Sequence, residues 1–234
     1  MEQFQLFNTP HLVVLIVTLA LCVILPLLAK YSGKKIRAVL AFLLLGSLAF
    51  ALIAAAVENY SNGYLSIAAV LPMHLSDWII IFVFVAFITR NVYSFEVLYF
   101  WGMGGTLQAI ITPELTINFP GLGFILFFIN HSVIIICIIY LMVVYRLRPY
   151  PVSIKRVFIW SQVYFASAFL VNLILDTNYG FLMEKPAQGT IIDFLGPWPY
   201  YLISLEMLAL LSFFIYYLPF YIYDRLASRR LNRS

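Results

Sequence analysis

Two short stretches place ionisable side chains inside segments that are apolar enough to cross a bilayer. The first contains His74, Ser76 and Asp77, and the second contains the pair Asn130-His131. An ionisable group at the centre of a membrane costs about 2.5–3.5 kcal/mol on insertion scales, so it usually faces the protein interior and marks a functional site. A histidine beside a hydroxyl, oriented by a carboxylate, is an arrangement that catalyses acyl transfer. We therefore expect the two histidines to meet in one intramembrane site.

The roles predicted for these side chains follow from how each can handle a proton. His131 is the expected general base and Ser76 the expected nucleophile, with Thr106 as a second candidate hydroxyl. Either Asp77 or Glu206 is expected to orient the base. The expected catalytic residues are His131, His74, Ser76 and Asp77, and the expected substrate-binding residues are Gln108, Asn130, Thr106 and Glu206.

His74 and Gln108 are also candidates for holding the oxyanion that develops during acyl transfer. Counted from the outer edges of their segments, all these side chains fall in the outer half of the membrane or near its midplane. We therefore expect one polar cavity between the third, fourth, fifth and seventh spans. Neither a metal nor another cofactor is expected, because no HExxH or similar ligand cluster is present.

Plainer explanations exist for each of these residues. A single membrane histidine often does no more than hydrogen-bond a neighbouring helix, and Asp77 or Glu206 can fix a helix in the same way. For the whole set, the alternative to an enzyme is a proton-coupled transporter or a small-ligand-binding protein, because histidines and carboxylates also form proton relays. A retinal-type Schiff base is excluded, since every lysine lies outside the predicted spans.

Other residues in the apolar segments predict local structure. Pro72 is expected to kink the third span just before His74. The glycines of residues 102–105 indicate close helix packing first and room for a substrate chain second. Cys22 and Cys137 lie in apolar runs without CxxC spacing and are expected to be small core side chains.

The composition requires a membrane to surround these segments. Hydrophobic residues make up 64% of the 234-residue chain, charged residues only 10%, and the mean hydropathy is +0.98. A soluble globular protein with this composition could not have a solvated surface. The chain is therefore predicted to be an all-α polytopic membrane protein, since the apolar runs show no alternation of the kind that membrane β-strands require.

Seven segments are long enough to span a bilayer, which takes about 20 apolar residues. They are residues 11–29, 38–57, 64–89, 92–112, 120–145, 157–175 and 198–223. No long polar stretch separates them, so residues 1–234 are expected to form a single seven-helix transmembrane domain. The longest loop, 176–197, is either a folded cap or a plain connection.

The basic residues set the orientation of these spans. Every Lys and Arg except Lys185 falls on one side of a seven-span topology. Because basic residues concentrate in cytoplasmic loops, the N-terminus is predicted outside and the C-terminus in the cytoplasm. The excess of positive charge then predicts contact with anionic lipid headgroups at the basic loops and the C-terminal tail, and not nucleic-acid binding. The expected location is the cell membrane.

Several stretches, taken together, resemble the bacterial YwaF-like family of integral membrane proteins. They are residues 71–77, 105–113, 130–131, 178–179, 185–186 and 196–200. That family looks related to a eukaryotic transmembrane acyltransferase that moves polyunsaturated acyl chains between phospholipids. It is more distantly similar to membrane hydrolases of fatty-acid esters that pair a threonine with a histidine.

The resemblance implies a role for His131, which matches the catalytic histidine of the eukaryotic relative. The relative's catalytic cysteine is expected around residues 73–76, where this sequence has none. The resemblance therefore implies that Ser76 replaces the thiol, that His74 and His131 act differently, or that the reaction differs. We predict a lipid acyl hydrolase or acyltransferase, with a proton-coupled transporter or ligand-binding membrane protein as the alternative.

Overall fold

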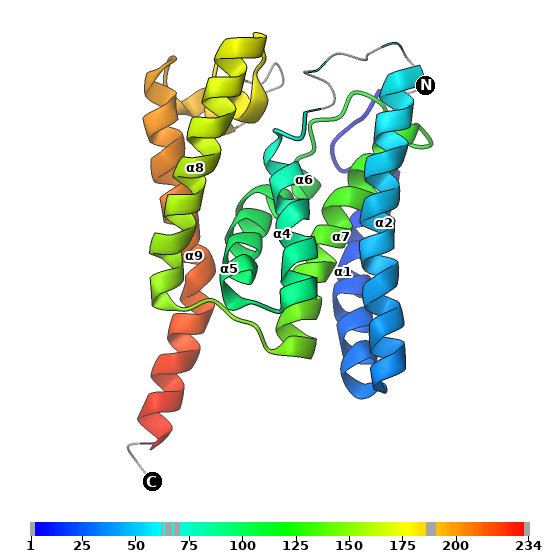
Figure 1. The fold of residues 1–234 in the computed structure, drawn as a ribbon, viewed down its shortest axis with the longest axis vertical. Helices are drawn as coiled ribbons and strands as arrows, with labels where there is room; N and C mark the ends of the chain where they lie inside the picture. The colour runs from blue at the N-terminus through cyan, green and yellow to red at the C-terminus, as the bar shows by residue number, and fades with distance from the viewer. Residues whose placement is uncertain (1–2, 62, 64–66, 68–70, 186–190, 232–234) are drawn as a thin grey trace. The chain divides into compact units, whose positions relative to one another are not determined.

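A computed structural model describes residues 3–61, 63, 67, 71–185 and 191–231 (Figure 1). Within these ranges the chain is helical and has no strand; an isolated antiparallel bridge joins Gln3 to Ile117. The helices group into two compact units, Met1–Leu147 and Arg148–Ser234, and each is described by itself. A single domain over residues 1–234 stays a prediction.

The first unit is built around one long helix, α7. Its elements are α1 (Thr9–Tyr31), α2 (Lys34–Ser61), α4 (Leu75–Thr89), α5 (Val92–Trp101), the π-helical turn η1 (Gly102–Thr106), α6 (Leu107–Ile111) and α7 (Leu122–Tyr145). Helix α7 contacts every other element of this group (Figure 1). Its apolar side chains, including Cys137, therefore form the core of the unit, while Cys22 of α1 is half-buried.

Polar bonds between helices fix how α1, α2 and α7 pack. Thr18 of α1 donates a hydrogen bond to Ser132 of α7 at 2.8 Å. At the other end of α7, the hydroxyl of Tyr140 donates to the carbonyl of Arg37 at 2.7 Å. The Arg37 guanidinium in turn donates to the carbonyl of Ala29 near the end of α1, which satisfies a backbone group that the helix leaves open.

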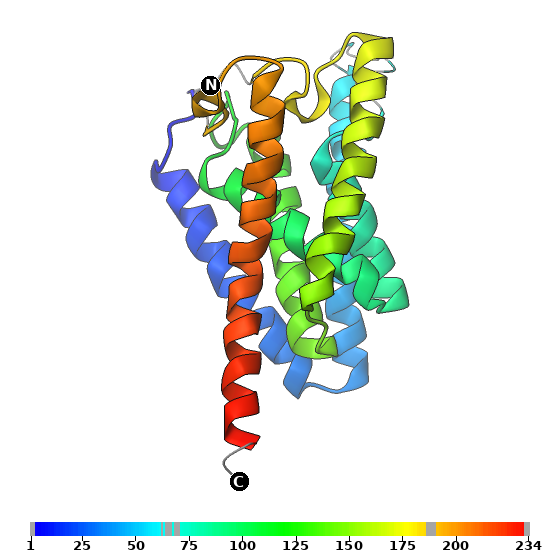
Figure 2. The same ribbon diagram turned by 90° about the vertical axis from the view of Figure 1, so that its left-hand side faces the viewer.

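The second unit consists of two long helices and the loop that connects them. Its elements are α8 (Pro151–Leu175), the 3₁₀ turns η2 (Tyr179–Phe181) and η3 (Ile191–Leu195), and α9 (Tyr200–Leu231). Helices α8 and α9 contact each other, and Figure 2 shows α9 as one continuous helix. Gln162 of α8 donates a hydrogen bond to the carboxylate of Glu206 on α9 at 2.6 Å.

Most of the predicted spans are confirmed as helices. Five helices among the described residues are long and apolar enough to cross a membrane, namely Thr9–Tyr31, Lys34–Ser61, Leu122–Tyr145, Pro151–Leu175 and Tyr200–Arg229. The fourth predicted span, 92–112, is also helical and consists of α5, η1 and α6 in succession. The orientation of the termini stays a prediction.

The third span needs a correction. It was predicted as a helix over 64–89, but residues 71–74 are not helical and α4 begins at Leu75; residues 64–66 and 68–70 lie outside the described part of the chain. Pro72 therefore precedes the helix and does not kink it. Proline disfavours the helical conformation in the residue before it, so a helix start soon after Pro72 is physically reasonable.

Candidate functional site

Helix α4 begins with a cap formed by two of the predicted site residues. His74 is the N-cap residue, with extended backbone, and its backbone N–H donates to Asp77 Oδ2 at 3.0 Å. An acidic side chain in the first turn also interacts favourably with the helix dipole. His74 and Asp77 are therefore the two residues of a helix cap, and the exposed His74 side chain lies at the helix entrance.

The predicted glycine cluster forms η1, a π-helical turn next to α7. A methyl group on Gly102 would collide with the side chain of Ile138 and touch Ile134, so the backbones approach closely there. This confirms the packing role predicted for the glycines. In η1 the carbonyl of Gly102 accepts the N–H of Leu107, five residues later. Such π turns are rare and are often found at functional sites.

Thr106 is the last residue of this turn, and its side chain lies in an unusual environment. Its side chain is 2% exposed, and its hydroxyl has no hydrogen-bond partner in the part of the chain that the structure describes. A threonine in a membrane helix usually donates to the carbonyl four residues earlier. For Thr106 that carbonyl belongs to Gly102, but the wider π turn bonds it to the N–H of Leu107, and the Thr106 hydroxyl makes no bond to it. Burying a hydroxyl without a partner costs about 1–3 kcal/mol, so this arrangement calls for an explanation.

His131 and Asn130 lie side by side on α7. The imidazole of His131 stacks on Phe127 with ring centroids 4.0 Å apart, and its Nδ1 lies 2.8 Å from the Phe127 carbonyl. A carbonyl oxygen only accepts hydrogen bonds, so Nδ1 carries the proton and Nε2 of the neutral ring holds a lone pair. The Oδ1 atom of Asn130 is buried and, among the described residues, has no hydrogen-bond donor.

The contacts of η1 and α6 with α7 indicate that Thr106 lies near the height of the Asn130-His131 pair. On one side of Thr106, Gly102 faces Ile134 and Ile138 of α7. On the other side, the carbonyl of Ile110 accepts a hydrogen bond from His11, whose ring lies 5.5 Å from that of Phe128 on α7. Thr106 lies midway between Gly102 and Ile110, and the Asn130-His131 pair lies between Phe128 and Ile134.

The start of α4 reaches the same height. A methyl group on Gly105 would lie 3.3 Å from Leu75 Cδ2, one residue after His74. Farther along, Phe82 of α4 packs edge-on against Trp101 of α5, with ring centroids 5.7 Å apart. The site therefore draws on three elements of the first unit: the entrance of α4, the turn η1 and the middle of α7.

The other predicted site residues lie in different settings. Ser76 is half-buried in the first turn of α4. Gln108 is exposed on α6, where its amide donates to the hydroxyl of Thr112 at 2.9 Å. Glu206 belongs to the second unit and accepts the hydrogen bond from Gln162. Among the described residues, no three His, Cys, Asp or Glu side chains could together hold a metal ion.

Comparison with known proteins agrees with this architecture. Residues 6–217, from the segment before α1 into α9, match the model of the TMEM164 family. The chain belongs to the TMEM164 family. It is therefore an integral membrane protein, although this match supports neither the narrower YwaF-like name nor a bacterial origin. No curated protein and no solved structure gives a significant match.

One buried histidine of this TMEM164-family chain was missed by the sequence analysis. His11 is 0% exposed at the start of α1; its Nδ1 accepts the N–H of Phe7 at 3.1 Å and its Nε2–H donates to the carbonyl of Ile110 at 2.9 Å. Asn8 and the proline after it do indicate a helix start here. The burial of His11 depends on a partner 99 residues away, which no local pattern reveals.

The described parts of the loop before α9 contain the 3₁₀ turns η2 and η3, and both the cap and the plain connection stay predictions. The buried Asn172 donates to the carbonyl of Tyr179 and accepts hydrogen bonds from the Tyr179 N–H and the Thr177 hydroxyl. Asn178 accepts from the backbone N–H groups of Met183 and Glu184. A recess of about 370 Å³ is lined by Asp176, Thr177, Asn178, Met183 and Glu184.

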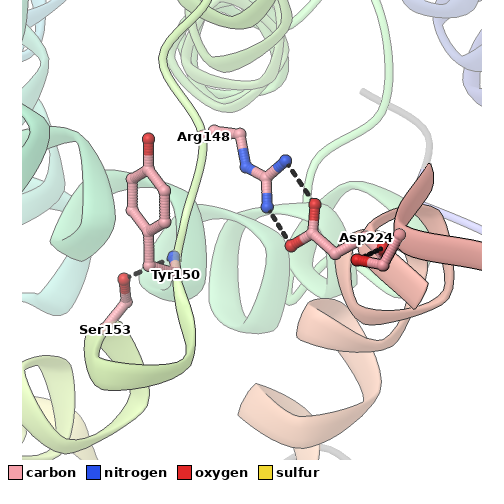
Figure 3. Close-up of polar contacts among 5 residues, drawn as sticks. Arg148, Tyr150, Ser153 and Asp224 are labelled. Carbon is pink, nitrogen blue, oxygen red and sulfur yellow. Dashed lines mark hydrogen bonds and ion pairs between the residues drawn. The ribbon is translucent and has the colours of Figure 1, made fainter. Parts of the chain in front are cut away.

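At the opposite end of the second unit, Arg148 forms a two-pronged ion pair with Asp224 (Figure 3). The guanidinium also lies 5.2 Å from the centre of the Tyr150 ring. The hydrogen bond to Asp224 raises the pKa of Arg148, which stays charged. The pair ties the segment before α8 to the end of α9; planar, bidentate pairs of this kind are among the stronger polar contacts.

Proposed function

We propose that this membrane protein cleaves ester-linked acyl chains from membrane lipids, as a hydrolase or an acyltransferase. The observation that carries the proposal is the buried, unpartnered hydroxyl of Thr106 at the height of His131. A hydroxyl kept without a partner in the protein is available to a reacting group. The resemblance to membrane hydrolases that pair a threonine with a histidine supports the same assignment of roles.

In the proposed first step, Nε2 of His131 takes the proton of the Thr106 hydroxyl while its oxygen attacks the ester carbonyl carbon. The tetrahedral intermediate then collapses, and the lipid oxygen leaves with the proton from Nε2. This step forms an acyl ester on Thr106 and releases the deacylated lipid. The proton on Nδ1, held by the Phe127 carbonyl, keeps Nε2 in the form that can act as a base.

In the second step, water or a second alcohol attacks the acyl ester and gives its proton to Nε2. The Thr106 oxygen leaves and recovers that proton, which restores both side chains. His74 at the entrance of α4 is proposed to help hold the oxyanion, and Ser76 is the second candidate nucleophile. Asp77 and Gln108 are proposed to act around the site and not at the reacting atoms, and Glu206, which belongs to the second unit, takes no part in the proposal.

Access to such a site is supported by the length of α4. Its 15 residues extend about 22 Å, compared with about 30 Å for the hydrocarbon core. Non-helical backbone at membrane depth is tolerated where it is buried in protein or lines a water-filled cavity. The exposed His74 at this entrance favours water reaching the site. With the N-terminus outside, as proposed, the opening faces the outer half of the cell membrane, and the basic loops contact anionic headgroups on the cytoplasmic side.

The test uses purified protein in nanodiscs that contain phospholipids with isotopically labelled acyl chains. Mass spectrometry follows free fatty acid and acyl exchange for the native chain and for His131→Ala, Thr106→Val, Thr106→Ser and Ser76→Ala. We expect losses of about 10²–10⁴-fold for His131→Ala and Thr106→Val, and residual turnover for Thr106→Ser.

The matched control is Ser132→Ala, next to His131 but bonded to Thr18 of α1, and it should keep turnover. Full activity in Thr106→Val together with loss in Ser76→Ala would move the nucleophile to Ser76. If every lipid stays unchanged with the native chain, the acyl-transfer proposal is wrong. Proton-coupled uptake in proteoliposomes then tests the transporter.

A further inference from the structure

Asn130 faces the π turn because of its place on α7. Residues 130, 134 and 138 are spaced by four and form one stripe along the helix. Ile134 and Ile138 of this stripe touch the position of Gly102. Asn130 continues the stripe by one turn, at the height of Thr106. His131 comes next in the chain, about 100° around the helix, so both side chains flank the same contact surface.

The Oδ1 atom of Asn130 indicates which kind of hydrogen-bond donor binds there. This atom is buried and has no donor among the described residues. A carboxamide oxygen only accepts hydrogen bonds, so the missing group must carry an O–H or N–H. The ester group of a lipid has neither, so the reacting group of the acyl donor does not satisfy this atom. The group that does so belongs to the second half of the reaction.

The identity of that group follows from counting protons. A nucleophile in the deacylation step must give one proton to Nε2 of His131, and a donor to Asn130 needs another. Water has two protons, whereas the single hydroxyl of an alcohol has one. A buried water also needs two to four polar partners. Asn130 Oδ1, His131 Nε2 and Thr106 Oγ1 supply three such atoms at one height.

We propose that Asn130 Oδ1 binds the water that deacylates Thr106, so that this protein is a hydrolase and not a transferase to lipid alcohols. The inference rests on the acyl-transfer function proposed above and identifies the acceptor of that reaction. The water donates a hydrogen bond to Asn130 Oδ1 and transfers its other proton to Nε2 of His131 while its oxygen attacks the acyl carbon. The bond between that carbon and Thr106 Oγ1 then breaks, and Oγ1 takes the proton from Nε2. The products are a free fatty acid and the restored Thr106 hydroxyl.

The experiment separates the two half-reactions in nanodiscs made with labelled phospholipid in ¹⁸O-water, with excess lysophospholipid as a competing alcohol. The native chain should release fatty acid that carries one ¹⁸O atom and should form little new phospholipid. In Asn130→Leu, the first release of deacylated lipid should keep its native rate, while fatty acid release falls by about 10²-fold. Intact-protein mass spectrometry should then show the acyl ester accumulating on Thr106.

Asn130→Asp, which keeps an acceptor oxygen, is the matched variant and should deacylate faster than Asn130→Leu. Equal loss of both half-reactions in Asn130→Leu would overturn the role of Asn130, and so would a native product that is mainly exchanged phospholipid. In both cases the acyl-transfer proposal stands. If the native chain forms no product, both proposals fail. Melting temperatures of the variants establish that each is folded.

Discussion

Two histidines in the first unit show opposite uses of the same side chain. His11 is fully buried, and both ring nitrogens have partners, the N–H of Phe7 and the carbonyl of Ile110. His131 is bonded at Nδ1 to the Phe127 carbonyl and is partly exposed. A ring with both nitrogens engaged cannot take up a proton without breaking a bond. A ring bonded only through its N–H keeps a lone pair for chemistry.

The polar groups around the two rings also differ in whether they have hydrogen-bond partners. Around His11 the N-terminal segment is bonded to the loop between α6 and α7, through Phe4 N–H to the Thr116 carbonyl and Asn8 to Asn118. Around His131, two buried polar atoms of the described residues lack partners, on Thr106 and Asn130. Satisfied polar groups hold the helices together, whereas the unsatisfied ones lower stability and are explained if a substrate or water completes them.

Thr106→Val tests this difference most strongly. Valine has nearly the shape of threonine and no hydroxyl, so it removes a buried group that has no partner. We expect turnover to fall by about 10²-fold or more, while the free energy of unfolding stays the same or rises by about 1 kcal/mol. The measurements are lipid turnover and thermal unfolding in the same detergent. A large loss of stability would mean that the hydroxyl has a structural partner, and the comparison with His11 would fail.

His11→Ala should give the reverse result. The substitution leaves the Phe7 N–H and the Ile110 carbonyl unpaired and opens a cavity among aromatic rings, so it should lower the free energy of unfolding by about 2–4 kcal/mol. Turnover per folded molecule should change little. Chemical denaturation checks the first expectation, and turnover normalised to folded protein checks the second. Leu19→Ala, at an exposed position of the same helix, is the control and should unfold like the native chain.

Asn172→Ala tests in the second unit whether hydrogen-bonded polar groups stabilise the fold. The three side-chain hydrogen bonds of Asn172 join the last turn of α8 to the loop that follows it. Because the two bonds to the Tyr179 backbone are buried, their loss leaves polar groups unpaired, and we expect a destabilisation of about 1–3 kcal/mol. Hydrogen exchange should accelerate at Thr177 and Tyr179 while the middle of α8 keeps its protection. Unchanged exchange at these amides would show that the loop does not depend on Asn172.

The helices could be predicted from the sequence because a bilayer demands long apolar runs with internally bonded backbones. The start of α4 could not, since the residues before Leu75 are as apolar as those after it. Only Pro72 and the capping pair of His74 and Asp77 mark the boundary. Read as one helix, the same residues suggested a shared catalytic face, whereas in the structure Asp77 bonds the backbone of His74.

The sequence predicts the membrane depth of the candidate site better than the hydrogen-bond partners of its residues. Counting from the span ends predicts a common height for Thr106, Asn130 and His131, and the turn that ends at Thr106 packs on α7 near Ile134 and Ile138. Which hydroxyl lacks a partner depends on the π turn, where Gly102 bonds Leu107, and glycines alone do not predict that register. The bond between Gln162 and Glu206 was missed because it depends on how α8 and α9 are aligned.

The smallest effect expected is the coupling between Thr18 and Ser132. Their hydrogen bond joins α1 to α7 one residue after His131, with both groups buried and paired. In a double-mutant cycle with Thr18→Val and Ser132→Ala, we expect a coupling energy of about 0.6 kcal/mol, because hydroxyls in a membrane also find partners when the helices separate. Turnover should be unaffected in all three variants. A coupling near zero with normal activity would mean that van der Waals packing alone holds α1 on α7, whereas loss of activity would place this bond among the supports of His131.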